Sequence, residues 1–178
     1  MVVVHMDTKF DTAVMSRVYE GLDCTLFYTP TRRDRRAIME AIRNDDGPVV
    51  LLGHDTPRGL LDPTFVDYII ESRDVDLLRQ RTVIGIWCYA SEFADRYGLH
   101  GFFTSMFVSN LREAQEHQVD NLATEDNIMA EHELFCRTIN GFIRNEVPMS
   151  EWVENLQGMC NRELPFVRYN YEALSYYE

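Results

Sequence analysis

The chain is short of positive charge. Its 178 residues carry 17 basic and 29 acidic side chains, which gives a formal net charge of −12. A general nucleic-acid binder needs lysine and arginine to contact phosphates, and anionic lipid would repel such a chain. We therefore expect neither a nucleic-acid partner nor a membrane partner.

Closely spaced cysteines and long apolar runs are also missing. No CxxC pair occurs, so the cysteines are expected to be free thiols in a reducing compartment. The segment 1–5 lacks the charge and the apolar length of a signal peptide, and no apolar run reaches the length of a membrane span. These features predict a cytoplasmic protein. The four cysteines are Cys24, Cys88, Cys136 and Cys160.

Motifs that hold metals or nucleotides are absent. No HExxH occurs, and Glu113 and His117, four positions apart, lack the further ligands that a metal needs. Gly47, Gly53 and Gly59 form neither a GxGxxG nor a Walker pattern. We therefore expect no metal and no cofactor.

What the chain does have is two short apolar runs, each ended by a chemically reactive residue. Residues 48–53 end at His54, and residues 82–87 end at Cys88. Apolar runs without polar alternation suit strands of a parallel sheet that are buried on both faces. Ligands and chemistry collect at the carboxyl ends of such strands. Neighbouring strands would therefore bring an imidazole and a thiol to one edge, as a cysteine nucleophile and its base require.

The remaining pattern alternates strands with helices. Strands are predicted at 2–4, 24–28 and 101–108 in addition to the two runs, with helices between them. One of these helices is predicted around Phe65, Ile69 and Ile70, and another at 91–97, ended by Gly98. The prediction is a three-layer α/β fold with a mainly parallel sheet of about five strands. We expect one domain over 1–178, with a sheet core at 1–108, a helical part at 109–178 and a tyrosine-rich tail packed over the core.

The two runs with His54 and Cys88 resemble the caspase-like cysteine peptidases, which include caspases, metacaspases, gingipains and CHAT domains. Members have an apolar strand ending in His-Gly and a second apolar strand ending in the catalytic cysteine. The segment 59–61 also resembles the glycine and apolar pair that follow the family's histidine loop. This chain departs from the pattern at Asp55, where the family has glycine.

The resemblance implies a cysteine peptidase or related amide hydrolase that acts on a peptide or protein. Cys88 would be the nucleophile and His54 its base, with backbone donors near Asp55 and Cys88 at the oxyanion, and Gly53 would belong to the substrate-binding site. In the family, the end of the first strand contributes to the pocket for the residue before the cut. Asp7 lies there, so Asp7 and Asp55 would favour a basic residue.

Other interpretations remain open. Asp55 also fits a non-catalytic caspase-like domain that binds a partner protein, and a flavodoxin-like or Rossmann-like protein is a third possibility. Cys88 could be a small buried residue at a strand end, and Asp7 could cap a helix. The spacing of His132 suits a core histidine, and the arginines at 32, 33, 35 and 36 suit a solvated helix face.

Overall fold

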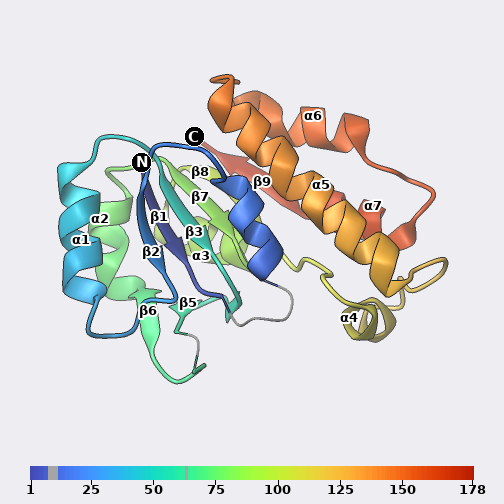
Figure 1. Ribbon diagram of the computed structural model, residues 1–178, viewed down its shortest axis with the longest axis horizontal. Helices are drawn as coiled ribbons and strands as arrows, with labels where there is room; N and C mark the ends of the chain where they lie inside the picture. The colour runs from blue at the N-terminus through green and yellow to red at the C-terminus, as the bar shows by residue number, and fades with distance from the viewer. Residues whose placement is uncertain (8–11, 63) are drawn as a thin grey trace.

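A six-stranded sheet forms the centre of the computed structural model, which describes residues 1–7, 12–62 and 64–178. The strand order is β2-β1-β3-β7-β8-β9, and every pairing is parallel except that of β8 with β9. The α/β class with a mainly parallel sheet is thus confirmed (Figure 1). The strands are β1 (Val2–His5), β2 (Thr25–Tyr28), β3 (Val49–Leu52), β7 (Val83–Ile86), β8 (Gly101–Thr104) and β9 (Leu174–Tyr177).

Both faces of this sheet are covered, which explains why its central strands are continuously apolar. All four residues of β1, β3, β7 and β8 are buried. Successive side chains of a strand point to opposite faces. Val50, Leu52, Ile84 and Ile86 accordingly join one core, whereas Val49, Leu51 and Val83 join the other.

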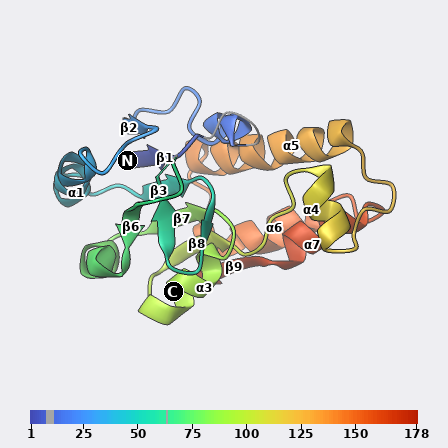
Figure 2. The same cartoon turned by 90° about the horizontal axis from the view of Figure 1, so that it is seen from below.

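The helices form the two outer layers, and Figure 2 shows them on either side of the sheet. Three cover one face: α1 (Arg35–Asn44), α2 (Val75–Leu78) and α3 (Ala90–Tyr97). The other face is covered by the 3₁₀ helix η1 (Ala13–Val18), α5 (Glu125–Arg144), α6 (Trp152–Met159) and α7 (Pro165–Glu172). The short element η2 (Ser72–Asp74) precedes α2, α4 (Leu111–Glu116) lies between β8 and α5, and η3 (Met149–Glu151) precedes α6.

Helix ends follow the local sequence. The expected helix at 91–97 is α3, and its C-cap Gly98 has a φ of +61°, a conformation that suits glycine. The longest helix, α5, begins with a capping box in which Thr124 and Asn127 bond each other's backbone N–H.

The helix predicted around Ile69 and Ile70 is wrong. These residues lie in β6 (Tyr68–Glu71), which joins β4 (Asp55–Thr56) and β5 (Gly59–Leu61) in a separate antiparallel sheet. The run is too short for its periodicity to separate a strand from a helix. Gly59 makes the pairing possible, because a Cβ there would lie 2.1 Å from the Ile70 carbonyl oxygen.

The C-terminal tail contributes more than packing. It contains α7 and the antiparallel edge strand β9, so the main sheet has one strand more than the five predicted. The strand predicted at 101–108 is shorter, and β8 ends at Thr104.

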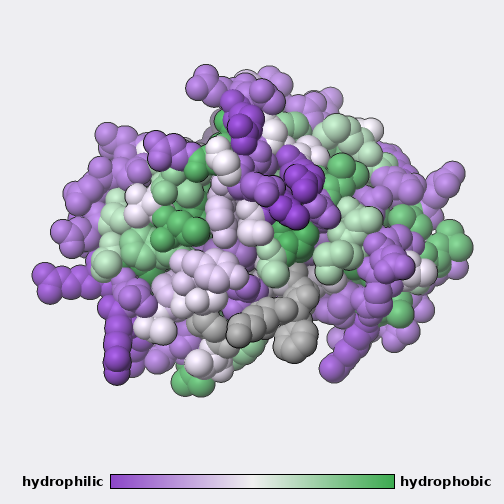
Figure 3. Space-filling view, in the orientation of Figure 1, coloured by the Kyte–Doolittle hydropathy of each residue, from purple (hydrophilic) through white to green (hydrophobic). Residues whose placement is uncertain are grey.

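The surface is mostly polar. Hydrophilic residues cover most of the face in Figure 3, with hydrophobic groups between them. Leu26 and Tyr28 are exposed on β2, at one edge of the main sheet. In the described part of the chain, no helix has the length and apolar character needed to cross a membrane.

Candidate active site at the carboxyl edge of the sheet

His54 and Cys88 follow two strands that lie side by side. Strands β3 and β7 are parallel neighbours, and Leu52 at the end of β3 is paired with Ile86 at the end of β7. His54 and Cys88 each lie two positions beyond this pair. The predicted arrangement of both residues at one carboxyl edge therefore holds.

The two residues also face the same side of the sheet and share a cavity. His54 continues the alternation of Val50 and Leu52, and Cys88 continues that of Ile84 and Ile86. Both side chains are partly buried, and both line a cavity of about 10 Å³, roughly the space of one water molecule. The imidazole and the thiol thus line the same small cavity.

Gly53 gives the end of β3 its shape. Its φ is +154°, and a Cβ would lie 2.7 Å from the Met6 Cβ. Its N–H donates a hydrogen bond to the Ile86 carbonyl oxygen at 3.2 Å, which extends the pairing by one residue. Gly53 lines the cavity, but this hydrogen bond already occupies its N–H.

Cys88 lies in a tight turn between β7 and α3. The Ala90 N–H donates to the Trp87 carbonyl oxygen at 3.2 Å, and Tyr89 inside this turn has a φ of +66°. A tyrosine in the left-handed region costs about 1–3 kcal/mol, and such strain collects at functional sites. The turn places Cys88 two positions before Ala90, the first residue of α3, and the positive end of that helix favours an anion.

Trp87 anchors the strand end immediately before Cys88. The Thr104 hydroxyl accepts a hydrogen bond from the Trp87 N–H at 3.1 Å and donates one to the Trp87 carbonyl oxygen at 2.8 Å. The indole is 1% exposed and fills the space over Gly85, where a Cβ would lie 2.8 Å from the ring. The backbone that carries Cys88 is therefore fixed from both sides.

Three lining residues with hydroxyl or imidazole groups were not predicted as site residues. His132 on α5 is 2% exposed, so the expectation of a core histidine is correct, yet the same residue lines the cavity. Its ring centroid lies 5.3 Å from that of Phe107. Thr104 and Ser109 also line the cavity. Nothing in the local spacing of these residues marks them, because Thr104 at the end of β8, Ser109 in the loop after it and His132 on α5 meet only through tertiary packing.

A second, open hollow lies on the other side of His54. It has a volume of about 260 Å³ and is lined by His54, Thr56, Leu61 and Phe65. The Phe65 ring centroid is 6.1 Å from that of His54, and Phe65 is 54% exposed. His54 thus lies between the thiol cavity and a mainly apolar surface hollow.

Asp7 lies in a buried polar network at the end of β1. Its carboxylate accepts hydrogen bonds from Thr12 Oγ1 at 3.1 Å and from the Tyr28 hydroxyl. The neighbouring His5 is fully buried between Tyr19, whose hydroxyl is 2.9 Å from Nδ1, and the Thr12 carbonyl oxygen, 2.9 Å from Nε2. Burial lowers the pKa of His5, although the bond to Thr12 and the Asp7 charge oppose this.

The structure does not bring Asp7 to the thiol cavity, since Asp7 is not among its described lining residues. Asp55 begins β4, and its side chain lies outside the described part of the structure. The predicted roles of Asp7 and Asp55 in substrate binding therefore stay predictions.

Tyr169 on α7 forms a hydrogen-bonded pair with His117. Tyr169 on α7 has its pKa raised by burial, with smaller contributions from Tyr89 and Cys88. The Tyr169 hydroxyl lies 3.2 Å from Nδ1 of His117. Helix α7 therefore contacts His117, the residue that follows α4.

The described residues of the site form no metal-binding cluster, and comparison with known proteins identifies no relative. Within 1–7, 12–62 and 64–178, no three His, Cys, Asp or Glu side chains are grouped so that they could hold a metal ion. The site therefore consists of a thiol, two imidazoles and hydroxyl groups at a sheet edge. No family model, curated protein or solved structure matches the chain.

Proposed function

We propose that the protein is a cysteine peptidase or related amide hydrolase in which Cys88 is the nucleophile and His54 the general base. One observation carries the proposal: the residues two positions beyond the paired Leu52 and Ile86 are a histidine and a cysteine that line one cavity. A nucleophile and a base within reach of each other are the minimum for covalent acyl transfer.

The reaction has two stages. His54 takes the thiol proton, and the Cys88 sulfur attacks the carbonyl carbon of the amide to form a tetrahedral oxyanion. The C–N bond then breaks, His54 gives its proton to the leaving amine, and a thioester remains on Cys88. Water, deprotonated by His54, adds to the thioester, and loss of the Cys88 thiol releases the carboxylic acid.

Backbone donors near the turn would stabilise the oxyanion. Because the Gly53 N–H is bonded to Ile86, the donors are assigned to the backbone after His54 and at Cys88. The two hydrogen bonds from Thr104 to the Trp87 backbone hold the strand end before the Cys88 turn, so these groups need little reorganisation during the reaction.

The proposal extends to the caspase-like family. The parallel histidine and cysteine strands, the preceding β1 and β2 units and the covered sheet all fit the resemblance. The proposed substrate is a peptide or protein. A basic residue before the cut is part of the proposal and rests on the Asp7 carboxylate.

A panel of fluorogenic peptides tests the proposal. Wild type should cleave at least one peptide, and Cys88→Ala and His54→Gln should each lower kcat/KM by a factor of about 10² or more. Cys160→Ala is the matched control, since Cys160 is also a partly buried thiol but lies after α6. Activity that persists in Cys88→Ala would remove Cys88 as the nucleophile.

His132 makes a further control necessary, because it lines the same cavity. His54→Gln and His132→Gln are compared for kcat/KM and for the pH profile of kcat/KM. Loss of the acidic limb, which reports protonation of the base, only in His54→Gln assigns the base to His54. Loss only in His132→Gln would transfer that role to His132.

The alternative is a non-catalytic caspase-like domain that binds a partner protein. A cysteine-directed peptide electrophile with mass spectrometry separates the two. Labelling concentrated on Cys88 supports the enzyme, whereas equal labelling of the accessible thiols supports the binding domain.

A further inference from the structure

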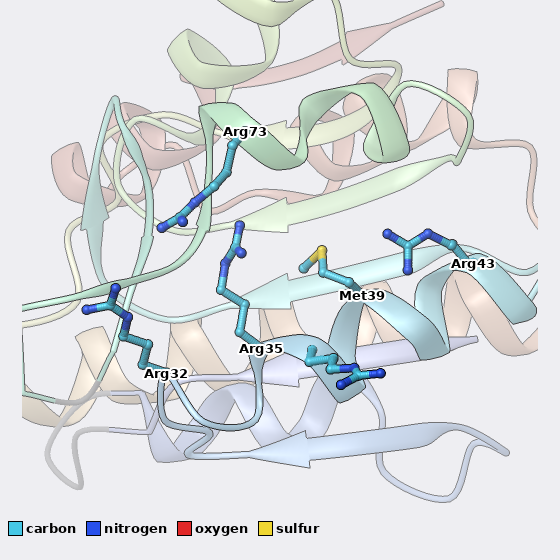
Figure 4. Close-up of a pocket in the computed structure, with 6 residues that line it drawn as sticks. Arg32, Arg35, Met39, Arg43 and Arg73 are labelled. Carbon is cyan, nitrogen blue, oxygen red and sulfur yellow. The ribbon is translucent and has the colours of Figure 1, made fainter.

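Another hollow, which shares no lining residue with the cavity at Cys88 or the hollow beside His54, is lined almost entirely by arginine. It has a volume of about 410 Å³ and opens to solvent between α1 and η2. Figure 4 shows the guanidinium groups of Arg35 and Arg73 reaching toward one another from these two elements, with Arg32 at the side. The lining consists of Arg32, Arg35, Arg36, Met39, Arg43 and Arg73.

The charges in this hollow are only partly compensated. Arg35 donates to buried Asp74, Arg73 donates to Glu71, and Arg32 lies 3.5 Å from Asp67. Arg36 and Arg43 have no ion pair within the described part of the chain, and both side chains are exposed.

Two positive charges therefore remain without a carboxylate in a hollow that five arginines share. The surplus contrasts with the net charge of −12 of the whole chain. Like charges held together repel, and a concave wall strengthens the local potential, so an anion that enters the hollow relieves this repulsion.

Arg35 is the arginine of the hollow whose position is fixed by a buried partner. The ion pair with Asp74 holds Arg35 in place, and the side chain of Arg35 is only 19% exposed. Its Nε is buried and has no hydrogen-bond acceptor within the described residues. Arg35 thus provides one guanidinium group held by an ion pair, and the exposed Arg36 and Arg43 provide two that no ion pair within the described residues holds.

The predominance of arginine indicates which chemical class of anion the hollow would bind. All five basic residues of the hollow are arginine, and the planar guanidinium fork donates two parallel hydrogen bonds to a phosphate. A single phosphate would satisfy one or two of these groups. Several phosphates close together are needed to use the full set, and the volume of about 410 Å³ accommodates them.

We propose that the hollow between α1 and η2 binds an anion with clustered phosphate groups, independently of the cysteine site. The partners are Arg36 and Arg43, with Arg32, Arg35 and Arg73 completing the wall. The phosphates could belong to a soluble polyphosphate or to a lipid headgroup, and the chemistry of recognition is the same for both.

Calorimetric titration with inorganic tripolyphosphate at low ionic strength tests the proposal. Wild type should bind with a dissociation constant below about 1 mM, and the affinity should fall as salt is added. The double variant Arg36→Gln, Arg43→Gln should weaken binding at least about tenfold. Both residues are exposed on α1, so thermal melting is expected to show a folded protein.

The matched control is the double variant Arg112→Gln, Arg168→Gln. It removes the same charge from exposed arginines on α4 and α7, each of which has its own glutamate. The control should bind tripolyphosphate as wild type does. An equal loss in both double variants would mean attraction by overall charge, and the hollow would not be a site.

Vesicles of phosphatidylcholine, with and without phosphatidylinositol bisphosphate, form the second arm. Binding to free tripolyphosphate supports a soluble anion, whereas binding only to the bisphosphate vesicles assigns the phosphates to a lipid. No binding in either arm overturns the proposal.

Discussion

The hydroxyl of Thr104 holds both polar groups of the Trp87 backbone. It accepts from the Trp87 N–H and donates to the Trp87 carbonyl oxygen, and Thr104 is fully buried. Backbone pairing of β7 with β8 ends at Gly85 and Phe103, so this side chain takes over where the ladder stops. The residue before Cys88 is therefore fixed by β8.

Replacement of Thr104 by valine keeps the shape and removes the hydroxyl. The buried Trp87 N–H then loses its partner, and we expect the free energy of unfolding to fall by about 1–3 kcal/mol. The kcat/KM should fall as well, because the Cys88 turn loosens. Urea denaturation measures the first effect, with Thr104→Ser as the control that keeps the hydroxyl. Equal losses in both variants would show that the methyl group, and not the hydrogen bonds, is important.

The four cysteines should differ in their reaction with iodoacetamide at pH 7. Cys136 is fully buried and burial raises the pKa of its thiol, and burial also raises the pKa of Cys24. Cys88 should therefore be carboxamidomethylated before both. Timed quenching and peptide mass spectrometry give the order. Faster modification of Cys136 than of Cys88 would contradict the proposed accessibility of the site.

The Asp7 prediction concerns the residue before the cut. If the Asp7 carboxylate contributes to that pocket, peptides ending in Arg or Lys should be cleaved better than those ending in Asp or Leu. Asp7→Asn should remove the preference, and its single amide oxygen keeps an acceptor for one of the two donors, Thr12 or Tyr28. Steady-state kcat/KM values for the four peptides measure it. An unchanged ranking in Asp7→Asn would leave Asp7 a purely structural residue.

Two glycine substitutions should have opposite effects on stability. Gly53→Ala forces a Cβ against Met6 at a positive φ, so we expect a loss of about 1–3 kcal/mol and a disturbed His54 position. Gly158→Ala meets nothing within 4 Å on α6 and should stabilise by about 0.5–1 kcal/mol. Thermal and urea unfolding compare the pair. A neutral Gly53→Ala would show that the end of β3 can move.

Acid should destabilise the protein through His5. Its folded-state pKa lies below the ordinary 6.5, so between these values the unfolded chain binds more protons and stability rises with pH. The contribution of neutral His5 to the free energy of unfolding is complete above about pH 6.5. It is lost as the pH falls toward the folded-state pKa, at up to about 1.4 kcal/mol per pH unit.

The variant His5→Phe isolates this effect. It should lower stability at neutral pH, because Tyr19 and the Thr12 carbonyl oxygen lose a partner, yet it should flatten the dependence on pH below 6.5. Urea unfolding between pH 5 and pH 8 measures both. A slope equal to that of wild type would assign the acid sensitivity to other groups.

The sequence by itself determined the central strands and the edge they share. Apolar runs that end at His54 and Cys88 can bury both faces only inside a covered parallel sheet, and the parallel direction brings their ends together. These are consequences of local composition and chain direction. The cap of α3 at Gly98 was likewise encoded locally.

Only the tertiary structure decided the features that depend on distant partners. Ile69 and Ile70 became part of a strand because β5 lies beside them, and the tail formed β9 because β8 offered an open edge. His132 reached the cysteine cavity through the packing of α5 on the sheet. In the same way, arginines that suited a solvated helix face became the wall of a hollow once Arg73 was placed opposite α1. Side-chain periodicity records which face of an element is buried, but it does not record which distant residue meets that face.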